Sequence, residues 1–163
     1  MTISESTELT RTLAELRAGV RVTVRDLSDA EIAKRTTVSE LTLGGVVKHL
    51  TQGERAWTHI LSGRPGVPDR MFDTSQYHLA GESLSHLLAE YSAAAAATDA
   101  AVAALPDLGV TVPLPEAPWE PGVVHHWTAR RILLHLIKET AQHAGHADLI
   151  RESLDGAQST GAA

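Results

Sequence analysis

The stretch HLIKETAQHAGHADLIRE, residues 135–152, decides the fold class of this 163-residue chain. Its apolar residues recur at steps of three and four, which is the period of an amphipathic α-helix. Thr128 is the expected N-cap, and the pattern continues to about Leu154 before Asp155-Gly156. One face of this expected helix carries seven apolar residues: Ala129, Ile132, Leu133, Leu136, Ala147, Ile150 and Leu154.

Polar residues interrupt that apolar face. At about 100° per residue, Glu139 and His143 fall near its centre, whereas His146 falls at its edge and His135 lies further away. Burying a carboxylate without a partner is costly, so we expect a compensating group beside Glu139.

Three other segments show the same helical period, at about residues 5–30, 42–62 and 82–105. Two long connections, residues 63–81 and 106–127, are rich in proline and glycine and are predicted to be loops. Four amphipathic helices of this length indicate an all-α four-helix bundle with two long connections.

The same pattern gives the expected domain organisation. GVTVPL, residues 109–114, is the one run that suggests an extended segment, and one run does not make a sheet, so no strand pairing is expected. A single domain is predicted over residues 1–156, followed by a disordered tail of residues 157–163.

Composition argues against several classes of function. The formal net charge is −6 and no basic run is present, which disfavours a nucleic-acid partner. The chain has no cysteine, so it has neither disulfides nor a thiol nucleophile of its own. No apolar run approaches the roughly 20 residues of a membrane-spanning helix, and no secretory signal is evident, so we expect a cytoplasmic protein.

The second expected helix also directs a polar residue toward the core. His49 falls on its apolar face, whose other members are Val46, Leu50, Trp57 and Ile60. Gly53, one turn later, leaves open space beside that imidazole. Glu139 and His143 are four residues apart on a helix, about 5–6 Å at Cβ, so both can bind one ion. With His49 they form a His2Glu set, which is the ligand type of catalytic zinc sites that keep positions open.

The residues alone leave other interpretations open. His49 by itself also fits a core histidine that hydrogen-bonds to a backbone carbonyl. Glu139 by itself also fits an ion pair with Arg130, Arg131 or an arginine of the first helix. A metal-free polar network is therefore as consistent with the pattern as a metal site.

A rival triad is open as well. His49, His143 and His146 can bind one ion, because residues three apart on a helix face the same side. Glu139 and His146 are roughly 10 Å apart along the helix axis, so one zinc ion with ligand distances of ~2 Å cannot bind both. The choice lies between Glu139 and His146, and the need to compensate a buried Glu139 favours Glu139.

Two stretches, LTLGGVVKHLTQGERAW (residues 41–57) and LLHLIKETAQHAGHADLIRE (residues 133–152), resemble the DinB-like superfamily. The chain is most similar to its small actinobacterial branch, which is related to the N-terminal domain of mycothiol-dependent maleylpyruvate isomerase. The resemblance extends from about Leu9 to Gly156. It is specific in the second and fourth helices and loose elsewhere.

This resemblance implies a DinB-like four-helix bundle that holds a divalent metal, zinc or nickel, with three side chains. One ligand is the histidine of the HL pair in the second helix, here His49. The other two lie four residues apart in the last helix, here Glu139 and His143. Glutamate at the first of these positions matches the isomerase, whereas many other members have histidine there. Family members are often homodimers, and the alanine-rich third helix is compatible with that.

The resemblance also implies a metal-dependent enzyme that transfers a low-molecular-weight thiol, such as mycothiol, to a small-molecule electrophile. Metal coordination lowers a thiol pKa and presents a thiolate at neutral pH, and a chain without cysteine takes its nucleophile from outside. The isomerase carries a further C-terminal domain that these 163 residues do not include, so S-transfer or a related thiol-dependent isomerisation is predicted rather than maleylpyruvate isomerisation itself. The alternatives are a non-catalytic stress-response protein that binds a metal or small ligand, and a purely structural polar network.

The long loops are expected to shape a substrate pocket. Trp57, Trp119, Trp127 and His126 are candidates to line it. The tryptophans fit equally well as core or loop anchors, and His126 as a solvent-exposed residue.

Two residues of the last helix are further candidates. His146 fits a hydrogen-bond donor behind a metal ligand or a proton carrier, and it also fits a surface histidine. Arg151 is a candidate to hold a substrate carboxylate, although helix C-termini attract arginine through the macrodipole.

Overall fold

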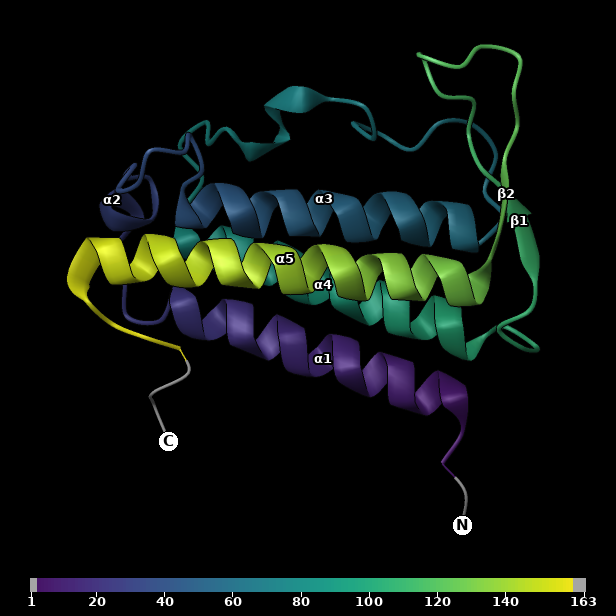
Figure 1. Cartoon of the computed structure of the whole chain (residues 1–163), viewed down its shortest axis with the longest axis horizontal. Coiled ribbons are helices and arrows are strands. Elements are labelled where there is room, and N and C mark those ends of the chain that lie inside the picture. Colours follow the sequence, from purple (N-terminus) through teal and green to yellow (C-terminus); the bar gives the residue numbers. More distant parts are fainter. Residues whose placement is uncertain (1–2, 160–163) are drawn as a thin grey trace.

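The structure, a computed structural model, describes residues 3–159 and contains four long α-helices packed side by side (Figure 1). In chain order the elements are α1 (Glu5–Thr23), α2 (Asp29–Ile32), α3 (Leu43–Leu61), η1 (Thr74–Tyr77), α4 (Leu84–Ala103), β1 (Thr111–Pro113), β2 (His126–Thr128) and α5 (Ala129–Asp155). The predicted all-α four-helix bundle is therefore confirmed. Residues 160–163 of the expected disordered tail lie outside the described residues.

Side-chain caps determine where the long helices begin. Ser4, Thr42, Ser83 and Thr128 each accept a hydrogen bond from the backbone N–H three residues further on. These bonds satisfy N–H groups that have no partner within the helix. α5 ends at Gly156, whose φ of 79° lies in the left-handed region that favours glycine.

The first helix is shorter than predicted. It ends at Thr23, and Asp26 then takes a positive φ of 61°, which is incompatible with a continuing helix. Ser28 begins the short α2 through a capping box with Glu31. Leu27 lies beyond the helix and still packs against the core, which explains why the apolar period continues past the true helix end.

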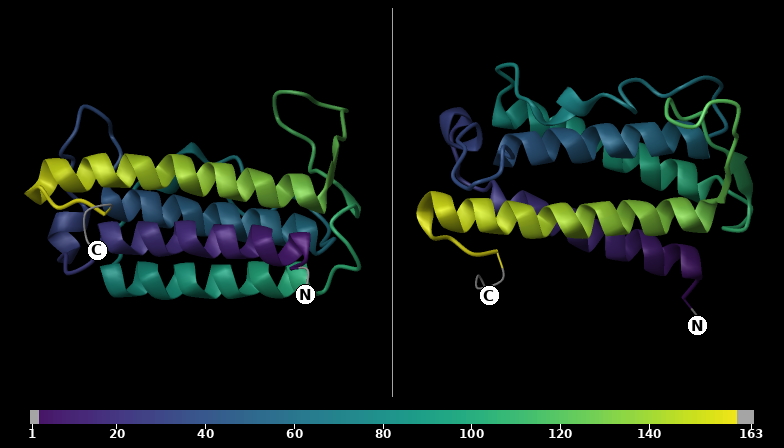
Figure 2. Two further views of the ribbon diagram at one scale, coloured as in Figure 1. Left: turned by 60° about the horizontal axis from the view of Figure 1, so that its bottom comes forward. Right: turned by 45° about the horizontal axis from the view of Figure 1, so that its top comes forward.

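The helices run in two parallel pairs. α3 and α4 run in the same direction, and α1 and α5 run in the opposite one (Figure 1). Because parallel helices cannot be joined by a tight turn, the segment 62–83 must return along α3, about 28 Å for 19 residues, before α4 begins. This segment and the loop 114–125 lie on the same side of the bundle, over α3 (Figure 2).

Two short strands pair, which corrects the prediction of no strand pairing. β1 runs antiparallel to β2, with Thr111 opposite Thr128 and Pro113 opposite His126. Each strand has three residues, too few to show an alternating apolar period, and β2 directly precedes a helix. The pair holds both ends of the loop 114–125 at one end of the bundle.

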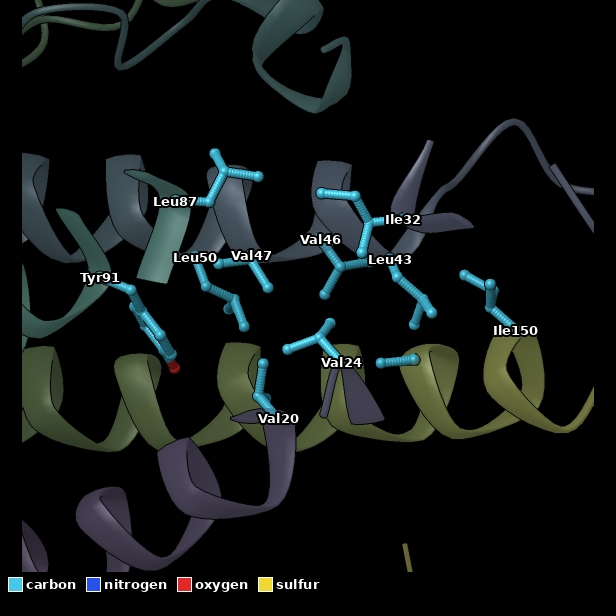
Figure 3. Close-up of a cluster of buried hydrophobic side chains, with 11 residues drawn as sticks. Val20, Val24, Ile32, Leu43, Val46, Val47, Leu50, Leu87, Tyr91 and Ile150 are labelled. Carbon is cyan, nitrogen blue, oxygen red and sulfur yellow. The ribbon is translucent and has the colours of Figure 1, made fainter. Parts of the chain in front are cut away.

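Two apolar clusters fill the bundle, one toward each end. The cluster shown in Figure 3 draws on five helices and comprises Val20, Val24, Ile32, Leu43, Val46, Val47, Leu50, Leu87, Tyr91, Ala147 and Ile150. The second comprises Ile60, Leu61, Val102, Leu108, Val112, Ala129, Ile132 and Leu133. Buried polar residues at the middles of the helices, including Arg17, Glu54 and Thr140, lie between the two clusters. No helix among residues 3–159 is both long and apolar enough to cross a membrane.

Candidate metal centre and adjoining cavity

Three metal-competent side chains meet between α3 and α5. His49 comes from α3, and Glu139 and His143 come from adjacent turns of α5. One potential ligand atom of each lies within 4.8 Å of the other two, and among residues 3–159 this is the one cluster of its kind. The structure therefore brings together the three residues that the sequence selected.

The surroundings keep both imidazoles neutral. Burial lowers the pKa of His143 to about 4; His49 and His146 lower it further, and Glu139 opposes them. Burial also lowers the pKa of His49, against the opposing effects of Gln76 and Glu139. A neutral imidazole has a free nitrogen lone pair, which is the form that binds a metal ion.

Glu139 supplies a negative charge to the cluster. Its side chain is 28% exposed, with Oε1 3.0 Å from Nζ of Lys138 and Oε2 3.9 Å from Nε2 of His143. Partial burial by itself would raise the pKa of Glu139, but Lys138, His135 and His143 bring it below its usual value. The centre of the buried helix face is occupied by Thr140 and not, as expected, by Glu139, which lies beside it.

This donor set fits a divalent metal ion. Two neutral imidazoles and one carboxylate suit zinc or nickel. Nδ1 of His49 is buried and has no hydrogen-bond partner among the described residues, while Nε2 lies 3.2 Å from the hydroxyl of Tyr77. The alternative of a core histidine held by a backbone carbonyl is therefore not realised.

The arginine partners considered for Glu139 are engaged elsewhere. Arg130 donates to Glu5, and the guanidinium of Arg131 lies 4.2 Å from the ring centroid of Trp127. Arg17, the buried arginine of α1, binds Glu54 through two hydrogen bonds. The interpretation of Glu139 as an arginine-paired structural residue is wrong.

Tyr77, at the end of η1, is a fourth group at the cluster. Its hydroxyl lies 3.2 Å from Nε2 of His49 and 3.4 Å from Nε2 of His143, and its ring stacks on His49 at 4.2 Å between centroids. Burial raises the pKa of Tyr77, and Glu139 raises it further, so the hydroxyl keeps its proton at neutral pH. The phenol O–H can therefore donate to one of these two Nε2 atoms at a time, in the tautomer that leaves that nitrogen unprotonated.

The segment that carries Tyr77 is fixed against α3. A Cβ at Gly45 would clash with the carbonyl oxygen of Tyr77, so only glycine allows this approach. Nζ of Lys48 lies 2.7 Å from the carbonyl oxygen of His78 and 2.6 Å from Oε1 of Glu82. Sequence analysis missed Tyr77 because it lies in a loop, but the glycine pair at the start of α3 signals such a close contact.

A cavity of about 460 Å³ adjoins the cluster. Residues of α3 and α5 form its floor, with His49 and Glu139 among them. Its walls come from the two long connections, through Met71 and Phe72 on one side and Trp119 on the other. Gly53 lines the floor, and a Cβ added there would meet no side chain or neighbouring element within 4 Å, so Gly53 leaves the predicted open space beside His49.

Aromatic rings dominate the lining. The rings of Trp57 and Trp127 stack at 5.1 Å with 8° between their planes, and His135 packs edge-on against both. Phe72 and Trp119 meet edge to face at 5.3 Å and so join the two loops. All three tryptophans that the sequence analysis selected line the cavity.

The remaining candidate residues lie elsewhere. His126 does not line the cavity; its neighbour His125 does, 2.8 Å from Glu120, because alternate residues of β2 and its approach face opposite sides. Arg151 binds Asp155 and the backbone carbonyls of Thr23 and Arg25. Its guanidinium is thus engaged near the C-terminal end of α5, and Arg151 is not among the residues that line the cavity.

His146 lies behind the cluster. Its Nδ1 is 3.3 Å from Nδ1 of His143, whereas Glu139 and Tyr77 face the opposite nitrogen, Nε2. This arrangement matches a residue that orients a ligand and disfavours the rival triad, in which His146 would bind the ion itself.

Comparisons with known proteins identify the family. A family model described as mycothiol-S-transferase matches residues 8–156. No curated protein matches the chain significantly. One matching solved structure is that of a conserved protein from Enterococcus faecalis, 14% identical, covering 96% of this chain and 100% of that one with a TM-score of 0.72. At this identity the likeness shows the shared fold alone. Because the family model matches most of its length, the chain belongs to the mycothiol S-transferase family, a DinB-like family.

Proposed function

We propose that this protein transfers a low-molecular-weight thiol, mycothiol, to a small electrophile, with a zinc or nickel ion held by His49, Glu139 and His143. The observation that carries the proposal is the position of these three side chains beside an aromatic cavity, in a chain of the mycothiol S-transferase family. A bound divalent metal supplies a thiolate at neutral pH by lowering the thiol pKa. The chain has no cysteine, so the thiol must come from a co-substrate.

The residues of the chain position the reactants. The ligand atoms belong to two helices that pack against each other, so they are in place before any ligand arrives. The aromatic walls give the reacting atoms largely apolar surroundings. The Tyr77 hydroxyl is placed to donate a hydrogen bond to an atom that binds beside both imidazoles. The cavity volume is within the range of small-molecule sites.

Metal analysis and turnover together test this proposal. Protein purified without chelator or histidine tag should contain about one zinc or nickel ion per chain. Thiol consumption with a panel of electrophiles should require both the metal and an added thiol. Full turnover after exhaustive chelation, or without any thiol, would rule the mechanism out.

Two matched histidine variants distinguish loss of the proposed metal ligand from loss of an exposed histidine. His49→Ala should lose metal and turnover together, whereas His86→Ala, at an exposed position on α4, should keep both. Stoichiometric metal without turnover across the thiol panel would favour the alternative of a non-catalytic metal-binding or ligand-binding protein. Absence of bound metal after incubation with zinc or nickel would favour a metal-free polar network.

A further inference from the structure

We infer that the cavity takes an uncharged aromatic electrophile and discriminates against electrophiles that carry carboxylates. This inference deepens the proposed function and rests on it, because it names the substrate class of the same site. It is argued from the charges and ring systems that line the cavity.

The lining contains carboxylates but no fixed cation. Glu54, Glu120 and Glu139 line the cavity, and no lysine or arginine is among its lining residues within the described chain. Glu54 accepts two hydrogen bonds from Arg17, and Glu120 accepts one from His125. The lining therefore has no unpaired positive charge to offer an anion.

The nearest cations are directed elsewhere. Arg131 covers the ring of Trp127 and is not part of the lining. Lys138 pairs with Glu139 and is 63% exposed to solvent. Lys48 binds Glu82 and the carbonyl of His78.

A metal ion does not change this balance. In the loaded site, Glu139 would offset one of the two positive charges of a divalent ion, and the thiolate of the co-substrate would offset the other. A substrate carboxylate would then be desolvated in the cavity without a partner, which is costly. A neutral electrophile avoids this cost.

The rings of the cavity favour flat substrates. Trp57 and Trp127 form a stacked pair on one wall, and Phe72 and Trp119 contact each other across the two loops. Trp119 is 75% exposed, so its ring is available to cover an entering molecule. Offset or edge-on ring contacts add to the transfer free energy of an aromatic ligand.

A matched pair of electrophiles tests the inference. Chlorodinitrobenzene and chlorodinitrobenzoate undergo the same substitution: the thiolate sulfur forms a bond to the ring carbon, and chloride leaves with the electron pair of the broken bond. The thiol proton is released to the buffer. Each kcat/KM is divided by the uncatalysed rate with the same thiol. The corrected ratio should favour the neutral compound by at least about tenfold, the equivalent of 1.4 kcal/mol. Equal or better use of the benzoate would overturn the inference.

A gain-of-charge variant sharpens the test. Gln52 lines the cavity from α3, and Gln142 is exposed on α5 outside it. Gln52→Arg should shift the corrected ratio toward the benzoate by at least about tenfold, because it supplies the missing cation. Gln142→Arg, the same substitution away from the cavity, should leave the ratio unchanged. An equal shift in both variants would contradict a role for the cavity wall.

Binding without reaction separates this inference from the proposed function. Dinitrobenzene and dinitrobenzoate lack a leaving group, and both quench tryptophan fluorescence when they bind near the rings. Tighter binding of dinitrobenzene than of dinitrobenzoate would support the inference, whether or not thiol transfer occurs. The absence of thiol transfer would refute the proposed function alone. Equal binding of the two would overturn the inference even if transfer is observed.

Discussion

The interior of this bundle contains two polar groups, the pair of Arg17 and Glu54 and the cluster of His49, Glu139 and His143. They differ in whether every buried polar atom has a partner within the chain. Arg17 and Glu54 form a closed pair with hydrogen bonds of 2.8 and 2.6 Å, and Thr98 donates to the same carboxylate at 2.8 Å. In the cluster of His49, Glu139 and His143, Nδ1 of His49 is buried and has no hydrogen-bond partner within residues 3–159. Both groups include a residue of α3, Glu54 in the first and His49 in the second, and both contain buried side chains, Glu54 and His143 among them, so the difference is not one of burial alone.

The comparison distinguishes a polar group whose partners all belong to the chain from one that has room for a further ligand. In the closed pair each charge is satisfied by the chain, so nothing further can bind without breaking it. In the open cluster the side chains converge with lone pairs and one negative charge, and the cavity leads to them. An incomplete polar group beside a cavity is a candidate site for this reason.

Breaking the closed pair should have the largest effect on stability. Arg17→Ala leaves Glu54 buried and uncompensated, so the free energy of unfolding should fall by about 3–5 kcal/mol in urea denaturation. Arg11→Ala, on the same helix, is the control: Arg11 and its partner Glu8 are 53% and 51% exposed. That variant should lose less than about 1 kcal/mol. A similar loss in both would mean that the buried pair does not stabilise the fold.

Acid should destabilise the metal-free protein through the open cluster. Below its ordinary pKa of 6.5 His143 binds a proton in the unfolded chain, but in the folded chain it does so only below about 4. The unfolded state therefore binds more protons between these values, and the free energy of unfolding should decrease by roughly 3 kcal/mol as pH falls through this window. Urea denaturation at several pH values measures it. His143→Gln should flatten the dependence, and an unchanged slope in that variant would contradict the assignment.

Removing the charge of the open cluster should affect metal binding and spare the fold. Glu139→Gln should weaken zinc binding by at least about 100-fold, because even residues behind a ligand cost 10–100-fold when they are replaced. Competition with a chromophoric chelator measures the affinity. The stability of the metal-free protein should change by no more than about 0.5 kcal/mol. Glu152→Gln, exposed on the same helix, is the control and should bind zinc as the wild type does.

The smallest effect should come from His146, which contacts the far nitrogen of His143. His146→Ala should lower zinc affinity by about tenfold, the low end of the range for residues behind a ligand, because it removes a contact to the ligand and no ligand itself. The same competition assay applies. If zinc binding survived loss of Glu139 and disappeared with His146, the triad of His49, His143 and His146 would replace the one proposed here.

The fold could be predicted where its causes are local. The helical period and the caps at Thr42 and Thr128 depend on residues within a few positions, and the structure has both helices where they were expected. The end of α1 could not be predicted from the sequence, because Leu27 continues the apolar period. The helix already ends before Asp26, whose φ is positive. The strand pair joins two segments on either side of the loop 114–125, and neither segment has a local sequence pattern that predicts the pairing.

The site residues also differ in whether they could be predicted from local sequence patterns. Glu139 and His143 are neighbours by helix geometry, and His49 follows from the apolar face around it, so the cluster could be selected from the sequence. Tyr77 and His125 could not, because they lie on connections whose course depends on contacts with α3 and on the strand pair. The sequence identified His126 in place of His125 for this reason.

The parallel course of α3 and α4 has a further consequence for how this protein can diverge. It requires a connection about as long as a helix, and that connection passes over the metal-competent side chains and supplies Met71, Phe72 and Gln76 to the cavity. The metal-competent residues belong to the helices, where substitutions are constrained by packing. Most of the connection can exchange side chains without disturbing the helices. Under the proposed function, the metal-competent residues and many of the residues that would contact a substrate belong to parts of the chain that can change independently, so relatives with these three residues can evolve different substrates.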